Sequence, residues 1–389
     1  MLDLAIRTER PRSAEEIAAI VADCGASGRR IELVGCGTKA SIGQPSEAEL
    51  RLSTAGMDRV IDYQPGELVL TAEPGVRLAE LERMTAAEGQ MLAFEPPRWT
   101  SLLGASGEPT LGGVLGANLS GPRRIRAGAA RDHFLGFQAV SGRGERFKAG
   151  GQVVKNVTGY DLMKLMAGSW GTLAVLTEVT IKVLPAPRTE TTLLLFGLSD
   201  ARAGEAAKAA MNGPFEVSGA AHLPSAAARR PPLGAELPTT ALRLEGFEAS
   251  VTARAEALAA ALKPFGRIDR LDAGHSRAFW AQIREVEAFA GDPRPLWRLS
   301  LPPAGGWRAA ERLAGDMLYD WAGALVWLLA ESDAAAVQMA AEALGGQAMR
   351  LGGGGAFPPL TGPLAKLNAR VKQAFDPLGV LNPGRMGIA

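Results

Sequence analysis

Thr110-Leu-Gly-Gly-Val-Leu-Gly-Ala-Asn-Leu-Ser-Gly121 opens the stretch of sequence that decides the fold, and Gly168-Ser-Trp-Gly-Thr172 leads into its last strand pattern. Glycines and other small residues recur here at positions where strands and short helices are expected. A chain tolerates such residues in regular elements mainly where its backbone must approach another group closely. The stretch therefore predicts a site for a bulky, flat, phosphate-bearing cofactor.

The composition is that of a globular chain without a pronounced charge. The 389 residues are 47% hydrophobic and 21% charged, a size that favours two domains. Lys+Arg 42 nearly balance Asp+Glu 41, so the net charge favours neither nucleic acid nor an anionic membrane as a partner. The longest apolar run, Ala324–Ala330, is far too short to span a bilayer, and no signal-peptide pattern is present. We expect a cytoplasmic protein with no transmembrane segment.

Cysteines and histidines are too few and too scattered for a metal or iron–sulfur site. The cysteines are Cys24 and Cys36, and the histidines are His133, His222 and His275. No C-x-x-C pair and no His-x-x-x-His spacing occurs. The sequence therefore predicts no metal site, and it assigns no role to His222 or His275.

The first half of the chain carries signals for a helix and for several strands. Ser13 to Glu16 forms a capping-box pattern that opens an amphipathic helix, which Gly25 and Gly28 end. A second helix starts near Leu78 and is closed by Gly89. A type II turn is expected at 64–67. Strands are expected at 31–34, 60–63, 68–72, 134–140, 145–148 and 173–184. Pro185 and Pro187 end the last of these strands and indicate a domain boundary.

The second half alternates strands with alanine-rich helices and contains fewer glycines. Strands are expected at 191–196, 240–245, 296–301, 325–329 and 348–351, and helices at 200–211, 250–263, 307–318, 333–344 and 364–375. This alternation favours an α+β sandwich of ferredoxin-like character. The run Gly352–Gly355 reads as a flexible joint.

The loop Gly35-Cys-Gly-Thr-Lys39 follows a predicted strand and is a candidate nest for a pyrophosphate. Its glycines permit positive φ angles, and Thr38 and Lys39 supply a hydroxyl donor and a cation. A Rossmann motif is excluded, because that motif must open a helix and Gly43 and Pro45 break one here. The alternative is a tight turn. For Cys36, a covalent flavin link or a redox thiol is weighed against a small residue that fits a crowded loop, and we favour the latter.

Three glycines of the opening stretch, Gly112, Gly113 and Gly116, give a smooth face to a short helix that Thr110 would cap. The helix N-terminus could receive a phosphate. The alternative is close packing of helix on sheet through glycine, and both interpretations are compatible.

Other polar residues in this region remain open between two interpretations. Arg131-Asp132-His133 is either acid–base machinery or a structural triplet with a paired Arg and Asp, and we favour the structural one. Lys155 and Tyr160 either bind an anion or belong to a surface turn. The local cluster of Arg123, Arg124, Arg126 and Arg131 indicates anion binding or a solvated loop.

Several motifs together resemble one known family. They are Phe94-Glu-Pro-Pro97, Ser120-Gly-Pro-Arg-Arg124, Gly150-Gly-Gln-Val-Val-Lys155, Lys155-Asn-Val-Thr-Gly-Tyr-Asp-Leu162, Gly168-Ser-Trp-Gly-Thr-Leu173 and the ending Asp376-Pro-Leu-Gly-Val-Leu-Asn-Pro-Gly384. The chain is similar to the vanillyl-alcohol oxidase (PCMH-type) superfamily, in the branch of D-2-hydroxy-acid dehydrogenases and glycolate oxidase subunits. The similarity spans nearly the whole chain but is weak between about 190 and 350.

The resemblance implies an α+β fold in three parts. Residues 1–187 would form a PCMH-type, two-lobed FAD-binding domain, residues 188–352 a ferredoxin-like α+β cap domain, and residues 353–389 a C-terminal segment that packs back on the FAD domain. It also implies that FAD is bound by Gly35, Cys36, Gly37, Thr38 and Lys39 at the pyrophosphate, by Thr110, Gly112, Gly113, Gly116, Ala117 and Ser120 along the dinucleotide and ring, by Glu178 at the adenine end, by Asn382 near the isoalloxazine, and by Arg131, Asp132 and Gly171. The loop lacks the His of covalent members, so the FAD is expected to be non-covalent.

The resemblance also suggests an activity and its partners. Stand-alone relatives hold the α-hydroxy acid with a His-x-x-x-x-x-x-His metal cluster, which this sequence lacks. It thus implies an FAD-binding subunit of a glycolate (D-2-hydroxy acid) oxidising complex, in which a sister FAD subunit carries the substrate site and an iron–sulfur subunit removes electrons. Peripheral membrane association through these partners stays open. One alternative is a self-sufficient oxidase that holds the substrate carboxylate with Arg123, Arg124 or Lys155. Another is a non-catalytic subunit. No catalytic residue is identified.

Overall fold

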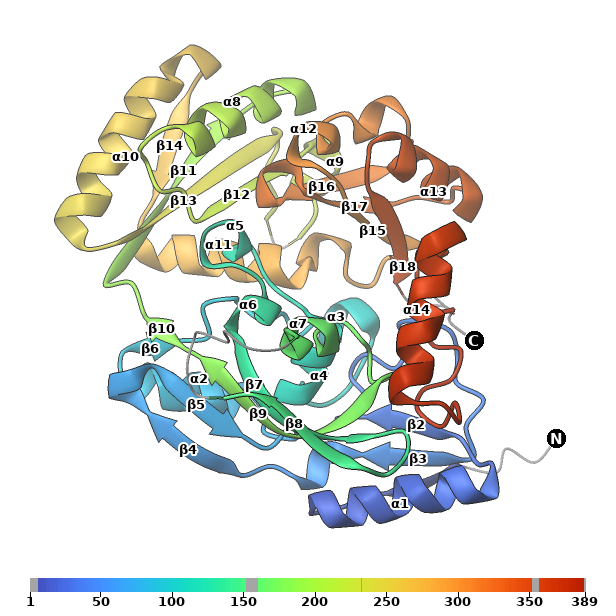
Figure 1. Cartoon of the computed structure of the whole chain (residues 1–389). Helices are drawn as coiled ribbons and strands as arrows, with labels where there is room; N and C mark the ends of the chain where they lie inside the picture. The colour runs from blue at the N-terminus through green and yellow to red at the C-terminus, as the bar shows by residue number, and fades with distance from the viewer. Residues whose placement is uncertain (1–5, 152–159, 232, 352–356, 388–389) are drawn as a thin grey trace.

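The computed structural model describes residues 6–151, 160–231, 233–351 and 357–387. Its first part is built on small sheets flanked by helices, and a large sheet with helices on both faces lies above it in Figure 1. Helices and strands are both abundant, so the α+β class expected from the sequence is confirmed. Lys155 and the run Gly352–Gly355 lie outside the described residues.

A three-stranded parallel sheet begins the first part. Its order is β1 (Arg7–Glu9), β3 (Leu50–Ser53), β2 (Ile31–Val34). Helix α1 (Ala14–Ser27) packs on it through Ile17, Val21 and Cys24. Ser13 caps α1 as predicted, but the Glu16 carboxylate accepts the N–H of Arg12 rather than that of Ser13. Only one half of the capping box is therefore formed.

The second sheet of this part has five antiparallel strands. Its order is β4 (Val60–Gln64), β5 (Val69–Ala72), β9 (Ala174–Lys182), β7 (Phe134–Ser141), β8 (Arg146–Gly150). The predicted hairpins 60–72 and 134–148 are confirmed. The turn between β4 and β5 is a short 3-10 helix, Pro65–Glu67, after which Leu68 takes the left-handed conformation that a type II turn would have placed at Gly66.

Short helices connect these strands, and α6 and α7 among them contact the second sheet. They are α2 (Leu78–Ala87), α3 (Thr100–Leu103), α4 (Leu111–Ala117), α5 (Arg124–Ala127), α6 (Ala130–His133) and α7 (Leu162–Met166). A two-stranded pair, β6 (Gln90–Met91) and β10 (Leu184–Pro185), completes this part.

The upper sheet in Figure 1 has eight strands and consists of two similar halves. Its order is β14 (Ile268–Leu271), β11 (Thr189–Phe196), β13 (Thr239–Gly246), β12 (Gly219–Leu223), β16 (Asp316–Asp320), β17 (Leu325–Leu329), β15 (Leu296–Ser300), β18 (Gln347–Leu351). Each half places its own strands in the order fourth, first, third, second, which is the pairing of a β-α-β-β-α-β unit. The second strands of the two halves meet at His222 and Tyr319. The ferredoxin-like character is confirmed.

Helices cover both faces of this sheet. They are α8 (Asp200–Asn212), α9 (Ser225–Ala228), α10 (Glu248–Leu262), α11 (Ala273–Glu285), α12 (Pro303–Gly306) and α13 (Ala334–Ala343). Apolar side chains of α8 and α10 form one core with the outer face. Those of α11 share another core with the inner face and with the first part of the chain. The inner face is thus the one that meets the first part.

The predicted helix at 307–318 is wrong. The structure has only the 3-10 turn Ala309–Glu311 there, and the chain then enters β16. Strands β12, β14 and β16 and helix α11 were not predicted. The β12 sequence, Gly-Ala-Ala-His-Leu, is short and poor in β-branched residues, so its pairing with β13 outweighs its weak propensity.

The chain crosses between the two parts twice, once near its middle and once near its C-terminal end. It leaves β10 at Pro185 and enters the eight-stranded sheet at Thr189. After β18, helix α14 (Gly362–Phe375) runs along the side of the molecule, and Leu381 then forms a parallel bridge with Ile31 of β2. We propose 187 and 352 as the domain boundaries on this basis. No helix in the described ranges is long and apolar enough to cross a membrane.

Candidate cofactor site

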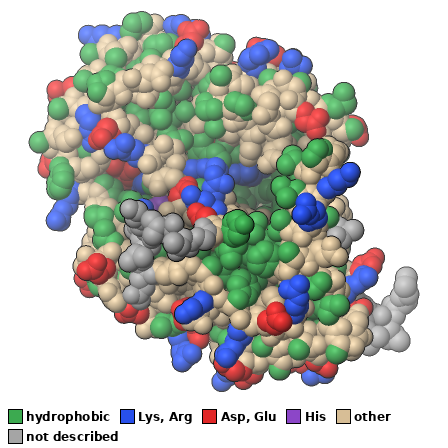
Figure 2. All heavy atoms as spheres, in the orientation of Figure 1, with side chains coloured by type: hydrophobic (Ala, Val, Ile, Leu, Met, Phe, Trp, Pro, Cys, Tyr) green, Lys and Arg blue, Asp and Glu red, His purple; other side chains and the backbone are tan. Residues whose placement is uncertain are grey.

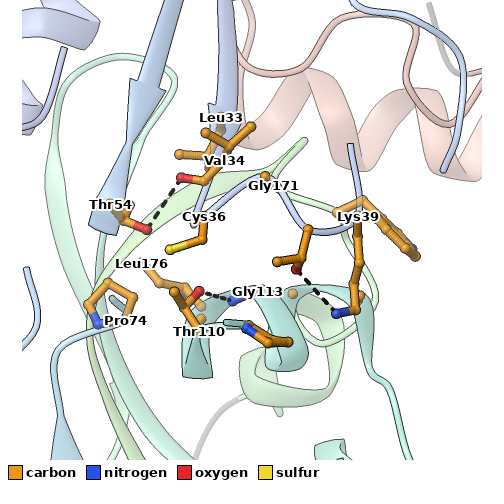
Figure 3. Close-up of a pocket in the computed structure, with 18 of the residues that line it drawn as sticks. Leu33, Val34, Cys36, Lys39, Thr54, Pro74, Thr110, Gly113, Gly171 and Leu176 are labelled. Atoms are coloured by element: carbon orange, nitrogen blue, oxygen red, sulfur yellow. Dashed lines mark hydrogen bonds between the residues drawn. The ribbon is translucent and has the colours of Figure 1, made fainter. Parts of the chain in front are cut away.

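A pocket of about 840 Å³, counted with its open mouth, lies between the 33–40 segment and α4. Figure 3 shows Leu33 and Val34 on one side of it and Thr110 and Gly113 on the other. The pocket is lined by Leu33, Val34, Gly35, Cys36, Gly37, Thr38, Lys39, Ala40, Thr54, Pro74, Pro109, Thr110, Gly112, Gly113, Gly116, Ala117, Met166, Ser169, Trp170, Gly171, Ala174, Leu176 and Arg385. Eleven of the predicted site residues are in this set, from three separate segments of the sequence.

The loop after β2 offers backbone donors to this pocket. Within the part of the chain that the structure describes, no acceptor is recorded for the N–H groups of residues 36–39. Gly37 takes a φ of +74°, which turns the loop back on itself. Consecutive free N–H groups in such a turn form an anion-binding nest.

The N-terminus of α4, in contrast, has no free donors. Leu111 N–H donates to Val76 O, Gly112 N–H to Pro74 O, and Gly113 N–H to the Thr110 hydroxyl. A Cβ on Gly112 would lie 2.6 Å from the Pro74 Cβ, and one on Gly35 would collide with the Thr110 hydroxyl. These two glycines therefore serve close packing of the loop, α4 and the 74–76 segment, and an anion would meet the 36–39 loop instead.

Two other glycines leave space for a ligand. A Cβ added at Gly37 or Gly116 would meet no protein atom within 4 Å, although both residues line the pocket. Close packing within the protein therefore does not require glycine at these two positions. The two glycines let a flat group lie directly on the backbone at these two points.

Two cations border the pocket. Lys39 is buried, and its ammonium donates to the Arg98 carbonyl at 3.2 Å and to the Thr38 hydroxyl at 3.5 Å. Burial lowers the pKa of Lys39 to about 8. Arg385 is also buried and donates to Lys39 O at 2.9 Å, while its Nε atom is buried without an acceptor among the described residues. Burial lowers the pKa of Arg385 as well, so a bound anion would relieve the cost of holding both charges here.

Cys36 lies half-buried in the loop with the Arg77 guanidinium beside its sulfur. Burial raises the pKa of the Cys36 thiol, although the charge of Arg77 opposes this. A thiol with a raised pKa is a poor nucleophile at neutral pH. The arrangement favours the interpretation of Cys36 as a residue that fits a crowded loop.

Five predicted site residues lie outside the pocket lining. Ser120 accepts the Ala130 N–H, and Asp132 accepts that of Ala129 and lies 3.9 Å from Arg131. Glu178 borders a separate recess on the five-stranded sheet. Asn382 is behind the lining, where it accepts the Leu33 N–H and donates to Trp170 O, both at 2.7 Å. Asn382 thus links the Leu33 and Trp170 segments, which both line the pocket.

The remaining candidates do not reach the pocket. His133 is fully buried between the carbonyl oxygens of Ala127 and Lys182, a structural arrangement. Tyr160 is 89% exposed. Two pocket residues, Arg385 and Trp170, were not predicted. Trp170 belongs to the motif Gly168–Leu173, and Arg385 directly follows the motif that ends at Gly384. The Arg385 guanidinium lies over the Trp170 ring. Charge next to a glycine-rich motif was the signal that could have found Arg385.

A buried charge network joins the two parts of the molecule above this region. Arg243 of the inner sheet face is 1% exposed and donates twice to Glu95 at 2.9 Å, and Arg123 donates to Glu245 at 2.8 Å. Burial opposes ionisation of Glu95, but Arg243 and Arg123 outweigh it and lower its pKa. Two residues from each part thus form one closed set of four charges.

A search for metal ligands gives a negative result within the described ranges. No group of three or more His, Cys, Asp or Glu residues there could hold a metal ion.

The sequence matches known families along different lengths. A family model described as "FAD binding domain" matches residues 7–150. The glycolate oxidase subunit GlcE of Escherichia coli (strain K12) is 37% identical over 357 residues, which cover 90% of this chain and 91% of that protein. The glycolate oxidase subunit GlcD of Bacillus subtilis (strain 168) is 34% identical over 187 residues, covering 47% of this chain and 38% of that protein.

Solved structures share the fold at low sequence identity. A p-cresol methylhydroxylase with bound substrate aligns with a TM-score of 0.72 over 98% of this chain and 88% of its own, at 15% identity. An alkyldihydroxyacetonephosphate synthase aligns with a TM-score of 0.66 over 97% of this chain and 76% of its own, also at 15% identity. These alignments confirm the expected PCMH-type fold.

Proposed function

The chain belongs to the family of the Escherichia coli glycolate oxidase subunit GlcE, and on that premise we propose that it is the FAD-binding subunit of a complex that oxidises glycolate or a related D-2-hydroxy acid. The same comparisons confirm FAD as the expected cofactor and an oxidoreductase that acts on a CH–OH group as the expected enzyme class. The identity of the acid, the electron acceptor and the partners are parts of the proposal.

One observation carries the proposal. The pocket brings together free backbone donors at 36–39 and two glycines, Gly37 and Gly116, that leave open space above the backbone. A dinucleotide with a pyrophosphate and flat rings needs both features. The residues present therefore fit FAD.

Each part of the pocket has a distinct task in this proposal. The 36–39 loop, with Lys39 and Arg385 beside it, would hold the pyrophosphate, and Gly116, Ala117 and Gly171 would border the rest of the dinucleotide. We propose non-covalent binding, because the thiol of Cys36 is kept protonated. When bound, FAD supplies the two-electron acceptor that oxidation of a CH–OH group requires.

The partners follow from what the chain contains. It has two cysteines, Cys24 and Cys36, and an iron–sulfur cluster is usually held by four. Electrons would therefore leave through another subunit that carries such a cluster. The likeness of 187 residues to a GlcD subunit supports a sister flavoprotein as a second partner.

Purification from the native source and of the chain alone tests the proposal. We expect a yellow protein that releases intact FAD on acid denaturation, co-purifies with a second flavoprotein and an iron–sulfur protein, and is reduced by glycolate or D-lactate only in that complex. Anaerobic bleaching of the isolated chain by glycolate would support the self-sufficient oxidase instead. A colourless chain that cannot be loaded with FAD would contradict the cofactor assignment.

A further inference from the structure

Trp321 has two arginines over its indole ring. The guanidinium carbon of Arg124 lies 4.2 Å from the ring centroid and that of Arg298 lies 5.2 Å from it. The position of this group is fixed by one carbonyl, Gly121 O, which accepts the Trp321 Nε1–H at 3.0 Å and the Arg124 N–H at 3.1 Å. Arg124 belongs to α5 and Arg298 to β15, so the two cations come from opposite sides of the junction between the two parts of the chain.

Neither cation has a carboxylate partner in the described ranges. Arg298 makes one side-chain hydrogen bond, to the Ser300 hydroxyl, and its Nε atom is buried without an acceptor. The internal segments 152–159 and 352–356 contain no Asp or Glu, so they cannot supply one. Burial, followed by the charge of Arg124, lowers the pKa of Arg298 to about 10. The acid whose charge acts on Arg298, Asp320, is a weak counter-charge because burial raises its pKa to about 7.

Such a pair is costly unless an anion joins it. Desolvated charges of one sign repel each other, and two other arginines at the junction, Arg123 and Arg243, are each compensated by a carboxylate. An indole under a guanidinium offers a cation–π contact, which lessens but does not neutralise the charge. A ligand carboxylate would neutralise both guanidiniums.

A chain of contacts leads from this site to the cofactor pocket. Arg298 is on the inner sheet face, opposite Trp327 in the register, and Trp327 packs edge-on against Trp99 with 5.3 Å between ring centroids. The residue before Trp99 is Arg98, whose carbonyl accepts the ammonium of the pocket residue Lys39. Figure 2 shows Lys and Arg side chains in the hollow between the upper and lower parts.

We propose that Arg298 and Arg124 bind the carboxylate of a small organic acid at the inner face of the eight-stranded sheet. A planar guanidinium offers paired N–H donors that match the two oxygens of a carboxylate. The aromatic floor of Trp321 and Trp327 suits a compact ligand better than an extended one. That the acid is a 2-hydroxy acid such as glycolate rests on the proposed function, whereas the anion site rests on the arginines alone. The chain then contributes carboxylate-binding groups of its own to the complex.

Titration of the FAD-loaded protein with glycolate tests this site. We expect saturable quenching of tryptophan fluorescence and a rise in the melting temperature, while ethylene glycol, which lacks the carboxylate, has neither effect. Arg298→Met should weaken glycolate binding about 10-fold or more, and Arg124→Met should weaken it less because that arginine is more exposed. Arg267→Met, at an exposed arginine that pairs with Asp269, is the matched control and should bind like the wild type.

The melting temperature of the Arg298→Met variant shows whether Arg298 binds a ligand or stabilises the fold. Without glycolate, Arg298→Met should melt at the same temperature as the wild type or higher, because an unpartnered buried cation has been removed. A lower melting temperature, or equal glycolate binding by the wild type and Arg298→Met, would overturn the proposal. Flavin content is read in the same samples. If the chain binds glycolate but cannot bind FAD, the proposed function is refuted and the anion site stands. If the chain binds FAD but not glycolate, the anion site is refuted and the proposed function stands.

Discussion

The cofactor pocket and the inner face of the eight-stranded sheet are linked by contacts but present different chemical groups, backbone in the first and charged side chains in the second. The pocket has exposed backbone at the 36–39 loop and at Gly116, where no side chain covers it. The inner face carries charged side chains, most of them paired across the junction by Glu95, Arg243 and their partners. A backbone site is lost when a side chain is added, whereas a charged face is lost when one partner is removed. The two regions should therefore fail in opposite ways under mutation.

The largest expected effect is at Gly116 in α4. Gly116→Leu adds a side chain where the protein leaves more than 4 Å free, so the helix should persist while the cofactor is excluded. We expect bound FAD to fall about 10-fold or more, measured as the ratio of absorbance at the flavin and protein bands after gel filtration. Gly274→Leu, in the first turn of α11 and far from the pocket, is the control.

The same measurement on Gly112→Val distinguishes the two kinds of glycine. Because a Cβ there would lie 2.6 Å from Pro74, this variant should lose melting temperature together with flavin. Retained flavin in Gly116→Leu would show that the pocket is not the flavin site.

The next effect belongs to the charged face. Arg243→Met removes the cation between Glu95 and Glu245 and leaves both carboxylates buried, which should cost about 3–5 kcal/mol of unfolding free energy. Denaturant unfolding measures this cost. The double variant Arg243→Met with Glu95→Gln should recover part of it, since it leaves less uncompensated charge; a double variant as unstable as the sum of both changes would contradict this account.

The sequence predicted these two regions to different extents, for a physical reason. The loop 35–39 and Gly112–Gly116 are contiguous motifs in which glycine has few functions, so a cofactor site was predictable. The contact of Arg124 with Trp321 joins residues almost 200 positions apart, and Arg298 reaches the same ring from another strand, so no local pattern encodes the group. Contacts of this kind are fixed by the register of β15 and by the docking of α5.

The errors in secondary structure have the same origin. The alanine-rich 307–318 segment has helix propensity, but the second β-α-β-β-α-β unit needs a strand at Asp316–Asp320 to pair with β17. Helix α11 could have been predicted, since Asp272 is an N-cap that accepts the N–H groups of Gly274 and His275. In the 307–318 segment, pairing with β17 outweighed the local helix propensity. For α11, the N-cap at Asp272 was a local signal that the sequence already contained.

A smaller effect on the charged face depends on pH. Burial raises the pKa of Asp320 to about 7, so the folded state favours the neutral carboxyl. Its contribution to stability is fully present below the unfolded pKa near 4 and is lost as the pH rises through about 7. Asp320→Asn keeps the oxygen that accepts the Trp321 N–H and should therefore be more stable than the wild type at pH 8, by on the order of 2–4 kcal/mol, and not at pH 4. Thermal unfolding at both pH values measures it, with Asp269→Asn, at a partly exposed carboxylate that pairs with Arg267, as the control. Equal differences at both pH values would count against the raised pKa.

The smallest effect is expected at Cys36, the one pocket residue whose side chain could bind a cofactor covalently. Burial keeps its thiol protonated, and the pocket holds a dinucleotide through backbone donors that a substitution at Cys36 leaves in place. Cys36→Ala should retain flavin within about twofold of the wild type, because no bond to the ring is lost. Precipitation with acid should release the flavin from both proteins. Flavin that stays with the precipitated wild type but not with Cys36→Ala would show a covalent link, and the pocket would then depend on a side chain after all, as the sheet face does.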